Sequence, residues 1–153
     1  RRQLRYCLLP NGTHSDVAMQ ALGRYSDTTE FDFMVDMGIW LENFAVPFVI
    51  NECLMQSYDG TLRLFPNWPL DERAEFHTLR AVGAFLVSAA CADGQVQWVR
   101  ITSEAGAPLR LVLPWSAGAE VARGDGTRTR VAGPLLELDT VAGETITISP
   151  LAS

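Results

Sequence analysis

Hydrophobic and polar positions follow two different patterns along this 153-residue chain, and the change falls near residue 60. Up to that point, the apolar residues occur in segments that carry helix-start and helix-stop signals. Beyond it, apolar and polar residues alternate in short runs, which is typical of strands because successive strand side chains point to opposite faces. The pattern predicts an α+β protein, with helices within residues 1–60 and an antiparallel β domain within residues 61–153.

Two short helical segments are expected near the start of the chain. Ser15 or Asp16 can cap a helix over residues 17–22, because both side chains accept hydrogen bonds from free backbone N–H groups. Asp27 and Glu30 have the spacing of a capping box, which predicts a second helix start.

A third helix is expected from about Val46 to Tyr58, entered through Pro47 and stopped at Asp59-Gly60. It is apolar nearly all round, which is typical of a helix buried among other elements. Its large apolar residues are Phe44, Phe48, Val49, Ile50, Leu54 and Met55. Three short helices cannot cover this apolar surface by themselves, so we expect a partner surface that belongs to a larger assembly.

The second part of the chain contains short β-rich runs separated by glycine-containing turns. The expected runs cover residues 62–64, 76–81, 84–92, 95–102, 109–113, 120–123, 135–139 and 145–149. Asp93-Gly94 lies between two alternating runs and predicts a hairpin with a type I′ turn. Seven or eight strands of this length indicate a β-sandwich of antiparallel sheets.

Composition and charge limit the classes of partner and cofactor that are expected for this chain. The formal net charge is −6, whereas a nucleic-acid surface would need a basic stripe. No apolar run approaches the ~18 residues of a membrane span. The two histidines and three widely spaced cysteines form no recognisable metal pattern. Neither nucleic acid nor membrane is therefore expected as a partner, and no metal or cofactor is expected.

Several short sequence motifs around the predicted boundary resemble those of glycoside hydrolase family 95, the α-L-fucosidase and α-L-galactosidase family. The matching motifs are Asn43-Phe44, Glu52, Leu54-Met55-Gln56-Ser57, Asp59-Gly60, Leu64-Phe65-Pro66, Leu79-Arg80-Ala81 and Gly83-Ala84-Phe85. The resemblance implies that residues 1–60 are the terminal helices of an incomplete (α/α)6 barrel and that residues 61–153 are its C-terminal β-sandwich domain. It also implies two partners, a carbohydrate substrate and the remainder of the barrel upstream in the chain.

Glu42 and Asn43 are the candidate catalytic residues under this resemblance. In the family, an Asp two residues before the Asn-Phe pair helps activate water, and Leu41 occupies that position here. Glu42 is the adjacent carboxylate. An inverting glycosidase needs one carboxyl group as acid and a second as base. Glu42 is therefore a candidate base, and Asn43 a candidate for orienting water or a sugar hydroxyl. Both residues also fit a capping role at a helix N-terminus.

Trp40 is the candidate substrate-binding residue, because its flat ring could stack on a pyranose. A core position between Ile39 and Leu41 is the alternative. The family's general acid lies upstream, so the chain by itself is expected to be catalytically incomplete. The sequence predicts a soluble protein and leaves its compartment open, with the periplasm and secretion considered for the parent enzyme.

The alternative function is a non-catalytic module, in which the β domain binds carbohydrate or serves only as structure. Exposed aromatic residues on one sheet face would favour sugar binding. Trp98 and Trp115 are the candidates, and both also fit core positions.

Overall fold

The computed structural model describes residues 40–151, with side chains from residue 47 onward. The chain divides into two compact units, Arg1–Asn51 and Glu52–Ser153, and each is described by itself. The two helical segments expected before residue 39 lie outside the described residues.

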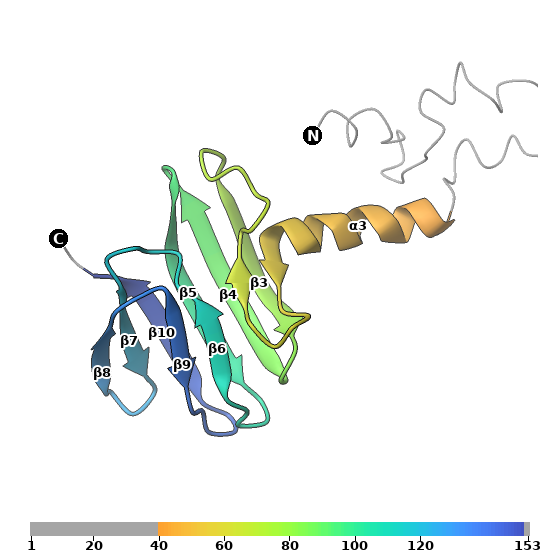
Figure 1. Ribbon diagram of the computed structural model, residues 1–153. Helices are drawn as coiled ribbons and strands as arrows, with labels where there is room; N and C mark the ends of the chain where they lie inside the picture. The colour runs from red at the N-terminus through yellow and green to blue at the C-terminus, as the bar shows by residue number, and fades with distance from the viewer. Residues whose placement is uncertain (1–39, 152–153) are drawn as a thin grey trace, which may run out of the picture. The chain divides into compact units, whose positions relative to one another are not determined.

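The helix α3 runs from Trp40 to Leu54 (Figure 1). It therefore begins before Val46 and ends before Tyr58, the bounds that the sequence pattern predicts. Pro47 lies inside the helix instead of at its entrance. Proline removes one backbone donor from a helix interior, so this position is an unusual one for it.

A small hairpin follows α3 directly and explains why the helix stops early. The strands β1 (Met55–Gln56) and β2 (Arg63–Leu64) pair antiparallel, with Met55 opposite Leu64. Gly60 has a φ of 75° and donates its N–H to the Ser57 carbonyl at 3.0 Å. The Asp59-Gly60 turn that the sequence predicts is thus present, and it joins two strands instead of ending a helix.

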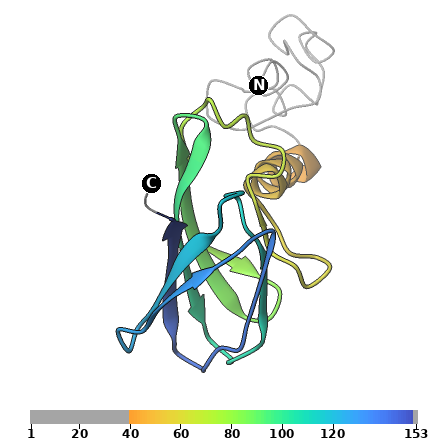
Figure 2. The same cartoon turned by 60° about the vertical axis from the view of Figure 1, so that its left-hand side comes forward.

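A six-stranded antiparallel sheet makes up most of the second unit. Its strands, in spatial order, are β3 (Ala74–Ala81), β4 (Phe85–Ala92), β5 (Gln95–Ser103), β10 (Thr145–Pro150), β7 (Ala119–Arg123) and β8 (Arg128–Val131). The sheet is strongly twisted, so that β7 and β8 run in a different direction from β4 (Figure 2).

Two further strands, β6 (Leu109–Val112) and β9 (Leu135–Leu138), form a separate antiparallel pair. This pair overlaps the middle of the large sheet in the view of Figure 1. A parallel bridge between Leu62 and Leu111 connects β6 to the segment that leads into β2.

The core consists of apolar side chains that recur at every second position of the central strands. The fully buried members include Val87, Val99, Ile101, Leu109, Leu111, Ile146 and Ile148. Each buried aliphatic side chain of this size contributes about 1.5–3 kcal/mol relative to an exposed one. This burial holds the β unit together and fixes which face of the large sheet points to solvent.

The prediction of antiparallel β structure after residue 61 is confirmed, and no helix occurs between residues 55 and 151. Asp93 and Gly94 have φ values of 53° and 80°, the two positive values that a type I′ hairpin requires. The strand β8 was not predicted. Its residues are almost all exposed, so it lacks the alternation of a half-buried strand.

Among the described residues, no helix is long and apolar enough to cross a membrane.

Candidate functional site

The predicted site residues Trp40, Glu42 and Asn43 all lie at the start of α3 as the structure describes it. The first backbone N–H groups of a helix lack intrahelical partners, and the helix dipole favours negative charge there. A carboxylate at Glu42 suits this backbone environment. Asn43 is the fourth residue of the described helix and does not occupy its N-cap position. The orientation of the three side chains lies outside what the structure describes.

Farther along α3, Phe48 and Val49 are largely open to solvent. Their exposed fractions are 63% and 56%, which is unusual for two adjacent large apolar side chains. Both residues belong to the apolar segment for which a partner surface is expected from the sequence, and that expectation stays a prediction. This part of the helix therefore presents a surface suited to apolar packing.

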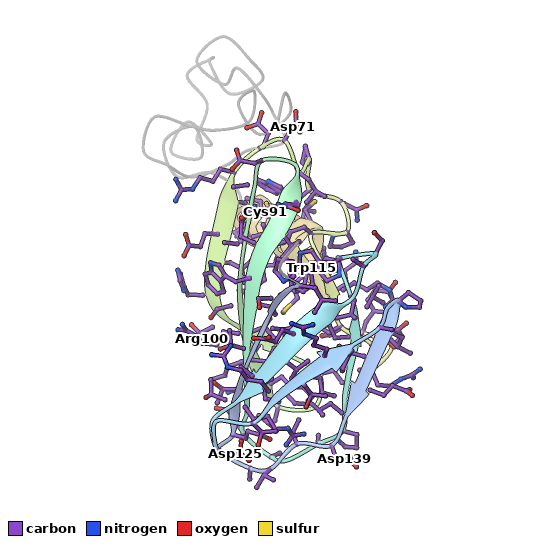
Figure 3. All side chains as sticks on the ribbon, turned by 90° about the vertical axis from the view of Figure 1, so that its left-hand side faces the viewer. Asp71, Cys91, Arg100, Trp115, Asp125 and Asp139 are labelled. Carbon is purple, nitrogen blue, oxygen red and sulfur yellow. The ribbon has the colours of Figure 1, made fainter. Side chains whose placement is uncertain are left out.

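The two tryptophans considered for sugar binding occupy different environments in the β unit. Trp115 is only 6% exposed, and its Nε1–H donates to the Val96 carbonyl at 2.7 Å. Trp98 is half-buried on β5. Figure 3 shows Trp115 between the strands, whereas Arg100 of β5 lies on the outer side of the large sheet. Trp115 is therefore a core residue, and Trp98 is the aromatic residue that a ligand could reach.

Trp98 is surrounded by groups that sequence reasoning did not bring together. The ring of His77, from β3, lies 6.2 Å from the Trp98 ring between centroids, with an interplanar angle of 38°. The Arg100 guanidinium carbon lies 5.8 Å from the Trp98 ring centroid. His77 Nε2 lies 3.0 Å from Glu75 Oε1. We call Glu75, His77, Trp98 and Arg100 the outer-face cluster.

A β-bulge in β3 lies directly beside His77. Phe76 pairs with Ala89, and regular pairing resumes with Leu79 opposite Val87. His77 and Thr78 therefore lie together opposite Ser88, which is one residue more than regular pairing allows. This irregularity carries no glycine or proline signal in the sequence, which is why periodicity alone could not locate it.

Thr78 carries the backbone strain of this bulge. Its φ is 55°, in the left-handed region that β-branched residues rarely adopt. Its N–H donates to Ser88 Oγ at 3.0 Å, so the side chain of Ser88 replaces a missing backbone partner. The bulge is thus held in place by a specific hydrogen bond.

Charged groups elsewhere in the β unit are mostly paired. Asp59 accepts two hydrogen bonds from the Arg63 guanidinium, both at 2.8 Å, and one from the Thr61 N–H at 3.0 Å. The Arg63 hydrogen bonds, followed by that from Thr61, lower the pKa of Asp59 to about 2. These contacts stabilise the β1–β2 turn and leave no free carboxylate there for chemistry.

The described residues contain no group of three or more His, Cys, Asp or Glu side chains that could hold a metal ion. Cys91 is fully buried, its thiol donates to the Glu72 carbonyl at 3.5 Å, and burial raises its pKa. Cys53 is half-buried on α3. Cys91 therefore behaves as a small apolar core residue.

The chain matches no protein-family model, and comparison with curated proteins also finds no match.

Proposed function

We propose that this chain is the C-terminal portion of a glycoside hydrolase of the α-L-fucosidase type. In this proposal, α3 belongs to the last helices of an (α/α)6 barrel, and the strands after it form the C-terminal domain. The observation that carries the proposal is the direct passage from α3 through β1 into antiparallel sheets. This segment lies within the sequence motifs on which the family resemblance rests, from Asn43-Phe44 to Leu64-Phe65-Pro66.

The proposed architecture of the C-terminal domain is a β-sandwich. The buried faces of β6 and β9 support it, because Leu109, Leu111 and Leu136 are at most 4% exposed although they belong to a two-stranded pair. A two-stranded pair cannot bury its own side chains, so another layer must cover them. The large sheet, with Val99 and Ile101 fully buried on one face, is the layer that we propose.

The proposed chemistry is inverting hydrolysis of a terminal sugar. Glu42 would accept a proton from the attacking water, and a carboxylic acid from the upstream barrel would protonate the leaving oxygen. In such enzymes the two carboxyl groups are ~6.5–9.5 Å apart, which leaves room for the water. Asn43 would orient the water or a sugar hydroxyl, and Trp40 would stack on the sugar ring.

Substitution of Glu42 by Gln in the full-length parent tests this assignment. Glutamine keeps the size of the side chain and most of its hydrogen bonds but cannot accept the proton. We expect kcat on an aryl α-L-fucoside to fall by about 10²–10⁴-fold, with little change in thermal stability. Glu52→Gln, a second acid of the same helix, serves as the control and should leave kcat within about twofold, because it removes no group from the proposed chemistry.

A Glu42→Gln enzyme that melts earlier and turns over normally would show that Glu42 only caps the helix. The same assay on the chain 1–153 alone should give no turnover above a heat-treated control, because the general acid is missing. Turnover by the chain alone would contradict the proposal that it is one part of a larger enzyme.

A second candidate function is carbohydrate binding by the β unit. The specific observation that favours it is the half-buried Trp98 on the outer face of the large sheet, beside His77 and Arg100. An aromatic face on a rigid sheet can receive the C–H groups of a sugar ring, because its π-system is negative above the plane. This function needs no catalytic residue and can be measured on the chain alone.

A further inference from the structure

The outer-face cluster lies where the sheet surface has small side chains. Trp98 on β5 is directly opposite Ala90 on β4, and Ala90 is directly opposite Glu75 on β3. Directly opposed residues have Cβ atoms about 4.5–5.5 Å apart, so a small residue at the middle position leaves space between the outer two. The indole therefore has no bulky cross-strand neighbour on β4.

The strand β3 adds an imidazole to this surface. Glu75 and His77 are two residues apart in β3 and therefore face the same side of the sheet. His77 comes within ring-contact range of Trp98. The bulge follows directly, and Thr78 in it has the strained φ of 55°. Strained residues persist where the surrounding structure holds them, and they cluster at functional sites.

Arg100 is the cation of the cluster, and its charge is not neutralised by any residue that the structure describes. Five other arginines of the β unit do have carboxylate partners: Arg63, Arg80, Arg110, Arg123 and Arg128 each form an ion pair. Arg100 instead lies 5.8 Å from the Trp98 ring and is exposed. An exposed guanidinium beside an aromatic ring offers a planar donor set for a carboxylate.

We propose that the outer-face cluster binds a saccharide that carries a carboxylate, such as a uronic acid unit. The inference rests on sugar binding by the β unit, the second function proposed above, and does not require hydrolase activity. The Trp98 ring receives the apolar face of the sugar, and Arg100 receives its carboxylate. The His77 ring, 6.2 Å from the indole between centroids, is a further polar group beside it. A nucleic acid fits less well, since its binding needs a basic stripe rather than one unpaired arginine.

Calorimetric titration of the chain 1–153 at low ionic strength tests the proposal with two matched probes. The first is trigalacturonate, and the second is its fully methyl-esterified form, which has the same rings without the charges. We expect saturable binding of the acid and at least about tenfold weaker binding of the ester, because the charge-assisted hydrogen bonds to Arg100 are lost.

Two variants and a control assign the binding to the cluster. Arg100→Gln should weaken binding of the acid by roughly tenfold, because a carboxylate loses its charged donor. Trp98→Ala should weaken the binding of both probes. Arg130→Gln is the matched control, because Arg130 is also an exposed arginine of the large sheet that forms no ion pair with a described residue. It should change the affinity by less than about twofold.

Three results would overturn the inference in different ways. Equal affinity for the acid and the ester would show that the site does not recognise the carboxylate. The proposal that the β unit binds sugar would be unaffected. Equal losses with Arg100→Gln and Arg130→Gln would show attraction by charge in general and no specific site. No saturable binding of either probe would reject both this inference and the second proposed function, with no consequence for the hydrolase assay on the parent. Arg100→Gln keeps the test valid even if Trp98→Ala fails to fold, since Arg100 is exposed.

Discussion

Asp59 shows how a single residue can connect the sequence, the fold and the response to pH. It sits in the turn between β1 and β2 and binds both the Thr61 N–H and the Arg63 guanidinium. The turn needs Gly60 for its positive φ and Asp59 for its hydrogen bonds. The Asp59-Gly60 motif, one of those that carry the family resemblance, thus has a physical role in starting the β unit.

The lowered pKa of Asp59 predicts a dependence of stability on acid. The folded-state pKa is about 2, below the ordinary value of 3.8. Its ionised form therefore stabilises the fold above about pH 4, and this contribution is lost as the pH falls towards 2. We expect Asp59→Asn to lower the melting temperature at neutral pH, and we expect this difference to shrink between pH 4 and 2.

Melting curves followed by circular dichroism at several pH values measure this effect. Asp71→Asn is the control, because Asp71 is an exposed carboxylate without an arginine partner among the described residues. A difference between Asp59→Asn and the unchanged chain that stays constant down to pH 2 would show that the ion pair contributes nothing to folding.

At the scale of elements, the bulge in β3 is the feature with the clearest local cost. A non-glycine residue in the left-handed region costs about 1–2 kcal/mol, and glycine in a strand costs about 0.5–1 kcal/mol in entropy. Thr78→Gly should therefore raise the free energy of unfolding by about 0.5–1 kcal/mol, because relief of strain exceeds the entropic loss. Urea unfolding at constant pH measures this change.

Thr129→Gly provides the matched control for this prediction. Thr129 is also an exposed threonine in a strand, and its φ is not positive. Its substitution should destabilise the chain by about 0.5–1 kcal/mol, since no strain is relieved. Equal destabilisation by the two substitutions would mean that the bulge is not strained.

The same elements show what sequence patterns can and cannot predict. The Asp93-Gly94 hairpin was predictable because two adjacent residues determine its turn type. The early end of α3 was not predictable from the sequence, because Met55 and Gln56 form strand pairs with residues after the turn. Tertiary pairing of this kind overrides local helix propensity.

The candidate sites, too, could be predicted from the sequence only in part. Trp98 could be proposed from sequence as one of two aromatic candidates, and burial separates it from Trp115. Its contacts with His77 and Arg100 depend on strand register, which periodicity does not specify. The roles of Glu42 and Asn43 remain predictions that rest on the family resemblance.

At the scale of the whole molecule, the apolar surface of α3 predicts self-association of the isolated chain. Phe48 and Val49 are adjacent and exposed. Adjacent exposed apolar side chains favour association, because burying them removes apolar area from water. We expect light scattering to give a mass above that of the monomer, and we expect Phe48→Ser with Val49→Ser to lower it. Val141→Ser is the control, because Val141 is a similarly exposed residue in the β unit. A monomeric chain that binds no hydrophobic dye would contradict this expectation.

The central claim is that these helical and β elements form the end of a larger glycoside hydrolase. The sequence of the coding DNA upstream of Arg1 tests it most directly. We predict an open reading frame that continues in phase for several hundred residues, with a pattern typical of paired helices and with further carboxylates for the general acid. An in-phase stop codon shortly before Arg1, with no such segment, would contradict the claim.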